Sequence, residues 1–135
     1  MALMNWSSAL AVGVNIIDTQ HQELVKLANE LSDAAAQGKG NNVLGDVFGR
    51  LIKYTASHFK TEEELMAKHG YPESPDHMAH HADLLKSVLA LQTQFKSGKQ
   101  VVSTPIIHFV RDWLIEHIMQ TDKAFAGFLN AKGVK

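Results

Sequence analysis

Two histidines, His77 and His81, stand four residues apart in the chain. On a helix that turns by about 100° per residue, side chains at this spacing lie one above the other on the same face. That face continues through the apolar residues Leu84 and Val88. The spacing therefore places two imidazole rings among core residues, where each ring needs a polar partner or a metal ion to offset the cost of its burial.

Other apolar stripes along the chain carry imidazoles and carboxylates as well. On one of them His58 and Glu62 are again four residues apart, so a nitrogen and an oxygen ligand can reach the same level of a core. Such ligands suit iron, zinc, manganese and similar ions, whereas calcium and magnesium prefer more oxygen. The candidate metal ligands are His21, His58, Glu62, His77, His81, His117 and Asp122. This set is too large for one tetrahedral zinc and fits two six-coordinate ions that share two bridging carboxylates.

Each of these signals is weak when taken alone, because a single buried histidine is more often a hydrogen-bonded core residue than a metal ligand. A metal-free interpretation of the whole set would need a separate partner for every buried imidazole and carboxylate, in a core that could have been apolar. The set therefore favours a metal site. His69, His80 and His108 lie off the stripes, and we interpret them as surface residues or as residues that support the site.

Asp122 does not share the regular spacing of the other candidates. It follows His117 by five residues, which separates the two directions by about 140° on a regular helix. Two arrangements could still bring both residues to the site. Either Asp122 lies at the edge of the apolar face and its side chain extends toward the site, or a one-residue π-bulge in the helix returns it to that face.

Apolar residues recurring at spacings of three and four predict four helices, with no strand pattern between them. We expect Asp18 and Ser74 to be N-caps, the latter followed by a proline at the first helical position. The fold class is all-α, an antiparallel up-down-up-down four-helix bundle with an N-terminal extended arm, forming a single domain over residues 1–135. The expected elements are an arm at 1–17 and helices at about 18–37, 42–68, 75–96 and 104–130.

Composition excludes several classes of protein. The formal charge of −1 leaves no basic surface for a nucleic acid, and the absence of cysteine rules out thiolate metal sites and disulfides. There is no apolar run long enough to insert into a membrane and no signal-peptide pattern at the N-terminus. We therefore expect a cytoplasmic protein that binds neither nucleic acid nor membrane.

The ordered motifs resemble those of the hemerythrin family, and most closely the single-domain bacteriohemerythrins. The resemblance rests on His21, the segment His58-Phe59-Lys60-Thr61-Glu62, the pair His77 and His81, and the segment from His117 to Asp122. It extends from the arm, where Trp6 lies, to the region of Phe125. It thus covers nearly the whole chain, and no candidate ligand departs from the family pattern.

The resemblance implies a cofactor of two non-haem iron ions (Fe²⁺/Fe³⁺) joined by an oxo or hydroxo bridge. It implies that His77, His81 and His117 hold one iron, that His21 and His58 hold the other, and that Glu62 and Asp122 bridge the two. The ion held by two histidines would have an open position for O₂. The implied function is reversible O₂ binding for storage, transport or delivery to an oxygen-consuming enzyme, by a monomer that is not itself an enzyme.

Five neutral imidazoles bring less negative charge than the carboxylate-rich sites that activate O₂, which favours binding over oxidation. Alternatives that use the same ligands are a di-iron oxidase, peroxidase or nitric oxide scavenger, and an O₂-sensing domain. Leu24, Trp113 and Leu114 lie within about one turn of His21 or His117. We expect these three residues to line an apolar O₂ pocket.

Overall fold

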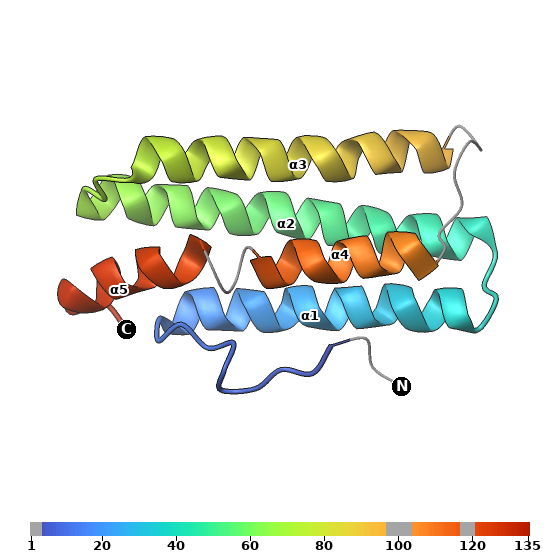
Figure 1. Cartoon of the computed structure of the whole chain (residues 1–135), viewed down its shortest axis with the longest axis horizontal. Coiled ribbons are helices and arrows are strands. Elements are labelled where there is room, and N and C mark those ends of the chain that lie inside the picture. Colours follow the sequence, from blue (N-terminus) through green and yellow to red (C-terminus); the bar gives the residue numbers. More distant parts are fainter. Residues whose placement is uncertain (1–3, 97–103, 117–120) are drawn as a thin grey trace.

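The computed structural model describes residues 4–96, 104–116 and 121–135. Within them the chain forms helices α1 (Asn15–Ala36), α2 (Asn41–His69), α3 (Ser74–Lys96), α4 (Thr104–Glu116) and α5 (Lys123–Ala131). Successive long helices run in opposite directions along the long axis of the molecule, and the N-terminal arm lies along α1 (Figure 1). Helix α1 packs against α2 and α4, and α2 packs against α3. The expected all-α four-helix bundle with an N-terminal arm is confirmed.

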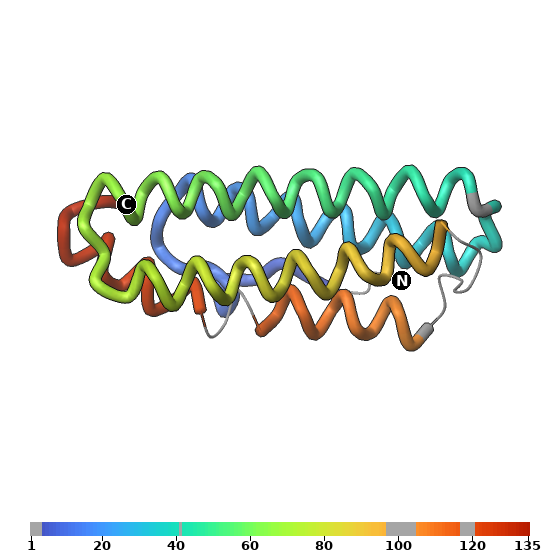
Figure 2. Tube along the Cα trace, turned by 90° about the horizontal axis from the view of Figure 1, so that it is seen from above, coloured from blue at the N-terminus to red at the C-terminus, as the bar shows by residue number. Residues whose placement is uncertain are grey.

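A short connection joins the antiparallel helices α2 and α3. Helix α2 ends at His69 and is capped by Gly70, whose left-handed backbone (φ 68°, ψ 44°) favours glycine. The N–H of Tyr71 then donates to the carbonyl oxygen of Met66 at 3.1 Å. The chain reverses within a few residues and starts α3 at Ser74. Seen from above, the four long segments lie alongside one another as two rows, one of α1 and α2 and one of α3 and α4 (Figure 2).

Two details of the expected elements were wrong. Helix α1 begins at Asn15, so Asp18 is a residue of its first turn rather than its N-cap. Its carboxylate instead accepts hydrogen bonds from the backbone N–H groups of Val12 (2.7 Å) and Gly13 (3.1 Å) and fixes the turn that ends the arm. Helix α3 begins at Ser74, so Ser74 is helical rather than an N-cap, and its hydroxyl contacts the sulfur of Met78 at 3.6 Å.

The single helix expected at 104–130 is described in two parts. Helix α4 covers Thr104–Glu116 and α5 covers Lys123–Ala131. Directly before α5, Thr121 and Asp122 have π-helical backbone. The π-bulge interpretation of Asp122 therefore agrees with the structure. His117 lies outside the described residues.

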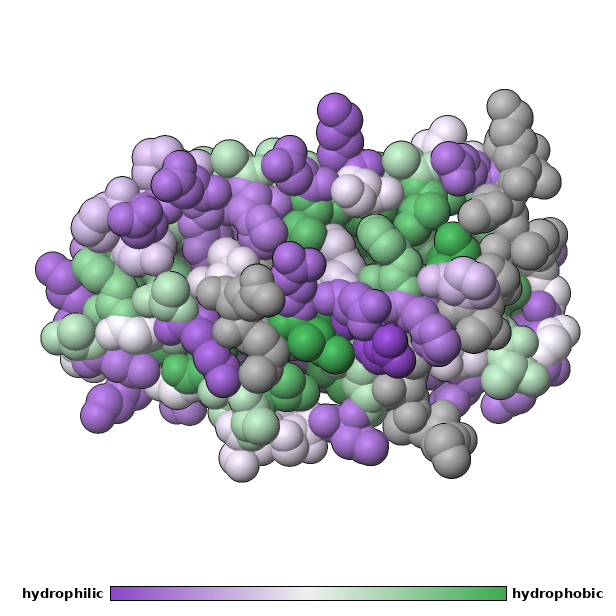
Figure 3. All heavy atoms as spheres, in the orientation of Figure 1, coloured by the Kyte–Doolittle hydropathy of each residue, from purple (hydrophilic) through white to green (hydrophobic). Residues whose placement is uncertain are grey.

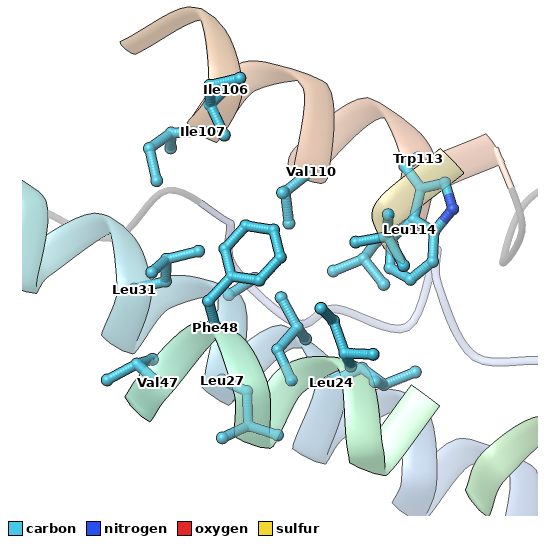
Figure 4. Close-up of a cluster of buried hydrophobic side chains, with 14 of the residues drawn as sticks. Leu24, Leu27, Leu31, Val47, Phe48, Ile106, Ile107, Val110, Trp113 and Leu114 are labelled. Carbon is cyan, nitrogen blue, oxygen red and sulfur yellow. The ribbon is translucent and has the colours of Figure 1, made fainter. Parts of the chain in front are cut away.

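The apolar core consists of two clusters. The larger one is formed by α1, α2, α3 and α4, and Figure 4 shows its central residues, including Leu31, Phe48 and Val110. The smaller one joins the end of the arm to the end of α2 and to α5, through residues such as Ile17, Met66 and Phe125. Along α1, His21 falls between Ile17 of the smaller cluster and Leu24 of the larger cluster. A buried polar layer thus interrupts the apolar core.

The surface seen in Figure 3 mixes hydrophilic side chains with smaller apolar areas. Its exposed large apolar side chains come from several elements, among them Ile16, Leu89 and Phe109. In the described part of the chain, every helix is too short or too polar to cross a bilayer.

Candidate metal centre

The polar layer contains six of the seven residues that the sequence singled out. Each is at most 5 % exposed, and they come from α1, α2, α3 and the residue directly before α5: His21, His58, Glu62, His77, His81 and Asp122. The seventh, His117, is outside the described residues. Charged or titratable groups at this depth need compensating partners. Their convergence from distant parts of the sequence therefore indicates a site rather than a set of isolated core residues.

Helix geometry explains why two pairs of these side chains point into the same layer. His58 and Glu62 lie one turn apart on α2, and His77 and His81 lie one turn apart on α3, so each helix delivers two side chains at neighbouring levels. Asp122 reaches the layer through the π-helical backbone before α5 and is fully buried. On a regular α-helix this carboxylate would point away from the buried polar layer.

One group of ligand atoms gathers around His21 and His58. The Nε2 atoms of these two rings are 3.1 Å apart. The Oδ2 atom of Asp122 lies 2.6 Å from His21 Nε2 and 3.4 Å from His58 Nε2. The Oε2 atom of Glu62 lies 3.5 Å from His58 Nε2. Two nitrogens and two oxygens therefore face a common point.

A second group gathers around His77 and His81. The Nε2 atom of His77 is 3.4 Å from Glu62 Oε1 and 3.2 Å from Asp122 Oδ1. The Nε2 atom of His81 is 3.0 Å from the same oxygen of Glu62. In each group one ligand atom per residue lies within 4.8 Å of the others.

The two groups share both carboxylates. Glu62 and Asp122 each turn one oxygen toward the His21 and His58 side and the other toward the His77 and His81 side. This is the arrangement needed for two adjacent cations bridged by carboxylates. The donor set, imidazole nitrogen with carboxylate oxygen, fits a divalent first-row transition metal.

Electrostatics also favour cations at this position. Burial, and then the neighbouring Asp122 carboxylate, raise the pKa of Glu62 well above its usual range. Two carboxylates in one dry layer repel each other unless positive charge lies between them. A cation on each side would remove this repulsion and keep both groups ionised.

Comparison with known proteins agrees with this geometry. Residues 12–129 match the sequence model of the hemerythrin HHE cation binding domain. The chain belongs to the hemerythrin family. A bacteriohemerythrin of Methylococcus capsulatus (strain ATCC 33009 / NCIMB 11132 / Bath) is 38% identical over 132 residues, which cover 97% of this chain and 100% of that protein.

Solved hemerythrin structures have the same fold. A crystal structure of wild-type hemerythrin superimposes with a TM-score of 0.89 at 37% identity, covering 95% of this chain and 98% of that one. A hemerythrin variant with leucine replaced by alanine gives a TM-score of 0.90 at 37% identity, with 96% and 98% coverage.

In this hemerythrin, hydrogen bonds behind the site set the tautomer of His58. The Thr61 hydroxyl donates to the carbonyl oxygen of Ser57 (3.1 Å), and its oxygen accepts from Gln20 Nε2 (3.2 Å). The amide oxygen of Gln20 therefore faces His58 and accepts from its Nδ1–H at 2.7 Å. With the proton held on Nδ1, the Nε2 lone pair of His58 is directed into the site.

His81 is oriented by a different partner. Its Nδ1 donates to the carboxylate of Glu63 at 3.1 Å, and its Nε2 again faces the site. Its ring also stacks on Phe59, with centroids 3.9 Å apart and planes 5° from parallel. No role at the site was predicted from the sequence for Gln20, Glu63 or Phe59. For Glu63 and Phe59 the available signal was adjacency to the candidate ligands Glu62 and His58.

A small apolar pocket includes Leu24 and Thr55, which lie one turn from His21 on α1 and from His58 on α2. It is lined by Leu24, Thr55, Phe59, Trp113 and Leu114 and is too small to hold a water molecule. The three residues that the sequence assigned to an O₂ pocket thus lie together, and Figure 4 shows Leu24 below Trp113 and Leu114. The structure adds Thr55 and Phe59 to the lining.

Two of the residues that line this pocket carry a polar group. The Thr55 hydroxyl donates to the carbonyl oxygen of Leu51 at 2.8 Å, which leaves its oxygen able to accept a further hydrogen bond. The indole nitrogen of Trp113 is buried and has no hydrogen-bond partner in the described part of the chain. Figure 4 shows this nitrogen on the side of the ring away from Val110.

The three remaining histidines differ in position. His69 is the last residue of α2 and is partly buried, rather than a residue of the following turn, and His108 is exposed on α4. His80 is partly buried on α3. None of the three belongs to either of the two ligand groups found among the described residues.

Proposed function

We propose that this chain binds O₂ reversibly at a non-haem di-iron centre. The observation that carries the proposal is the pair of ligand groups that share the carboxylates of Glu62 and Asp122, with one oxygen of each carboxylate turned to each group. We assign His21 and His58 to one iron, His77, His81 and His117 to the other, and Glu62 and Asp122 to the bridge. When bound, the iron pair would supply two electrons to O₂ and take them back on release.

The residues of the chain give reasons for binding rather than oxidation. Only two carboxylates are assigned to the site, and the other proposed ligands are neutral imidazoles, so little negative charge is available to stabilise highly oxidised iron. Gln20 and Glu63 hold the proton on Nδ1 of His58 and His81, which keeps their Nε2 atoms available as ligands. We therefore assign the chain a role in O₂ storage, transport or delivery to an oxygen-consuming enzyme, without catalysis of its own.

The pocket beside His21 and His58 supports the same assignment. Leu24, Trp113 and Leu114 are at most 5 % exposed, so they exclude water from the side of the site where we place O₂. Exclusion of water would slow the loss of bound O₂ as a reduced species, which would leave the iron oxidised.

Iron analysis and stopped-flow spectroscopy test the proposal. Protein reconstituted with Fe²⁺ should contain about two iron ions per chain, as expected for a dinuclear site. Mixing with O₂ should give a stable oxygenated spectrum that bleaches under argon. Continuous consumption of O₂ in the presence of a reductant would instead support a di-iron oxidase or peroxidase. A single tightly bound zinc would overturn the dinuclear assignment.

A further inference from the structure

The two halves of the site differ in the side chain that accepts a hydrogen bond from a histidine Nδ1–H group. On the His21 and His58 side, the Nδ1–H of His58 donates to a neutral amide, that of Gln20, at 2.7 Å. On the His77 and His81 side, the Nδ1–H of His81 donates to a carboxylate, that of Glu63, at 3.1 Å. The difference lies in charge, because both partners fix the same tautomer.

This difference changes how strongly each ring binds a cation. A carboxylate that accepts the Nδ1–H of a histidine raises the electron density at Nε2 and makes the ring a better ligand, whereas an amide does so more weakly. Removal of such an outer partner typically lowers metal affinity by about 10- to 100-fold. The side chain of Glu63 is 30 % exposed, so solvent reduces its effect. We therefore take the lower end of the range, about tenfold.

The surroundings hold both partners in place. The amide of Gln20 is oriented by Thr61, whose oxygen accepts from Gln20 Nε2 at 3.2 Å. The ring of His81 is held against Phe59 by the stacked contact, so its Nδ1–H stays directed at Glu63. An exchange of amide and carboxylate at either position would therefore alter charge with little change of shape.

We propose that Gln20 and Glu63 are positioning residues that widen the difference in affinity between the two metal positions. Glu63 strengthens the position of His77 and His81, and Gln20 leaves the position of His21 and His58 weaker, so the first ion enters beside His81. The inference rests on the proposed dinuclear site and goes beyond it, because it assigns an order of loading and the residues that set the difference in affinity.

Zinc titration of the metal-free protein tests the order. With ¹⁵N-histidine labelling, the first equivalent of Zn²⁺ should shift the Nε2 resonances of His77 and His81, and the second should shift those of His21 and His58. Competition with a chelator gives the two stepwise affinities. These measurements do not depend on O₂ chemistry.

Two isosteric substitutions test the residues. Glu63→Gln should weaken the first binding step by about tenfold, and Gln20→Glu should strengthen the second step by a similar factor. Each substitution therefore reduces the difference in affinity between the two binding steps, the first by weakening the tighter step and the second by strengthening the weaker step. Glu64→Gln is the matched control, because it removes the same charge from the exposed neighbouring residue on α2. It should leave both steps nearly unchanged.

Three outcomes would overturn the inference. They are entry of the first ion beside His21 and His58, an equal loss of affinity in Glu63→Gln and Glu64→Gln, and an effect of Glu63→Gln on thermal stability alone. Saturation at one ion per chain would refute the dinuclear proposal instead. The response of that one ion to Glu63→Gln and Gln20→Glu would still decide the inference.

Discussion

Replacement of Leu114 by alanine tests whether the pocket keeps water away from the site. Leu114 is 1 % exposed and lines the small apolar pocket. The substitution removes three carbons, at about 0.8 kcal/mol each by transfer. The cavity left behind adds about 1–2 kcal/mol, because the surrounding side chains relax only partially. We expect a loss of about 4 kcal/mol, or about 14 °C in the thermal midpoint of a chain of this length.

The enlarged pocket should also become wet. A buried water needs at least two polar partners, and the Thr55 hydroxyl oxygen and the Trp113 indole N–H provide them. Water beside the site should accelerate the conversion of oxygenated protein to the oxidised form several-fold, as followed by absorbance. Adding Thr55→Val to Leu114→Ala removes one partner and should return the rate toward that of the wild type.

Leu31→Ala provides the control for stability. Leu31 is fully buried in the same apolar cluster but does not line the pocket. It should destabilise the protein by a similar amount and leave the autoxidation rate unchanged. If Leu114→Ala oxidises no faster than Leu31→Ala, the pocket does not protect the site, and the reasoning about dryness is wrong.

Two further predictions follow from the same structure. In metal-free protein the pKa of Glu62 is raised above its ordinary value of 4.5, so its contribution to stability is present below that pH and is lost as the pH rises through the folded-state pKa. Urea unfolding across pH should therefore show Glu62→Gln gaining stability relative to wild type as the pH rises, and a constant difference would contradict this. Asp18→Ala removes the acceptor for Val12 and Gly13 and should cost about 1–2 kcal/mol, with faster amide exchange at Val12. Asp18→Asn, which keeps one acceptor oxygen, should lose less.

The candidate ligands could be predicted from sequence because their signal is local. Residues four apart on an apolar stripe, such as His77 and His81, must share a face of any helix they form. The spacing of five residues between His117 and Asp122 was also informative. It left two ways to bring Asp122 to the site, one of them a π-bulge, and Asp122 does have π-helical backbone.

Contacts between separate elements could not be predicted in the same way. Asp18 has the residue type and position of an N-cap, yet its carboxylate holds the turn of the arm, which depends on how the arm meets α1. Gln20 and His58 are 38 residues apart in sequence, and their hydrogen bond exists only because α1 and α2 pack in one register. Thr55 and Phe59 belong to the pocket for the same reason.

Helix α3 is attached to the bundle in an unusual way. Its only fully buried residues are His77, His81 and Val88, and its other apolar side chains are at most partly buried. Two of the three buried residues are therefore proposed iron ligands, so in the iron-loaded protein part of the free energy that docks this helix would come from coordination rather than from the hydrophobic effect. In iron-free chains α3 should be the first segment to exchange its amide hydrogens and to be cut by proteases. Iron supply would then govern not only whether the protein binds O₂ but also how long an unloaded chain survives.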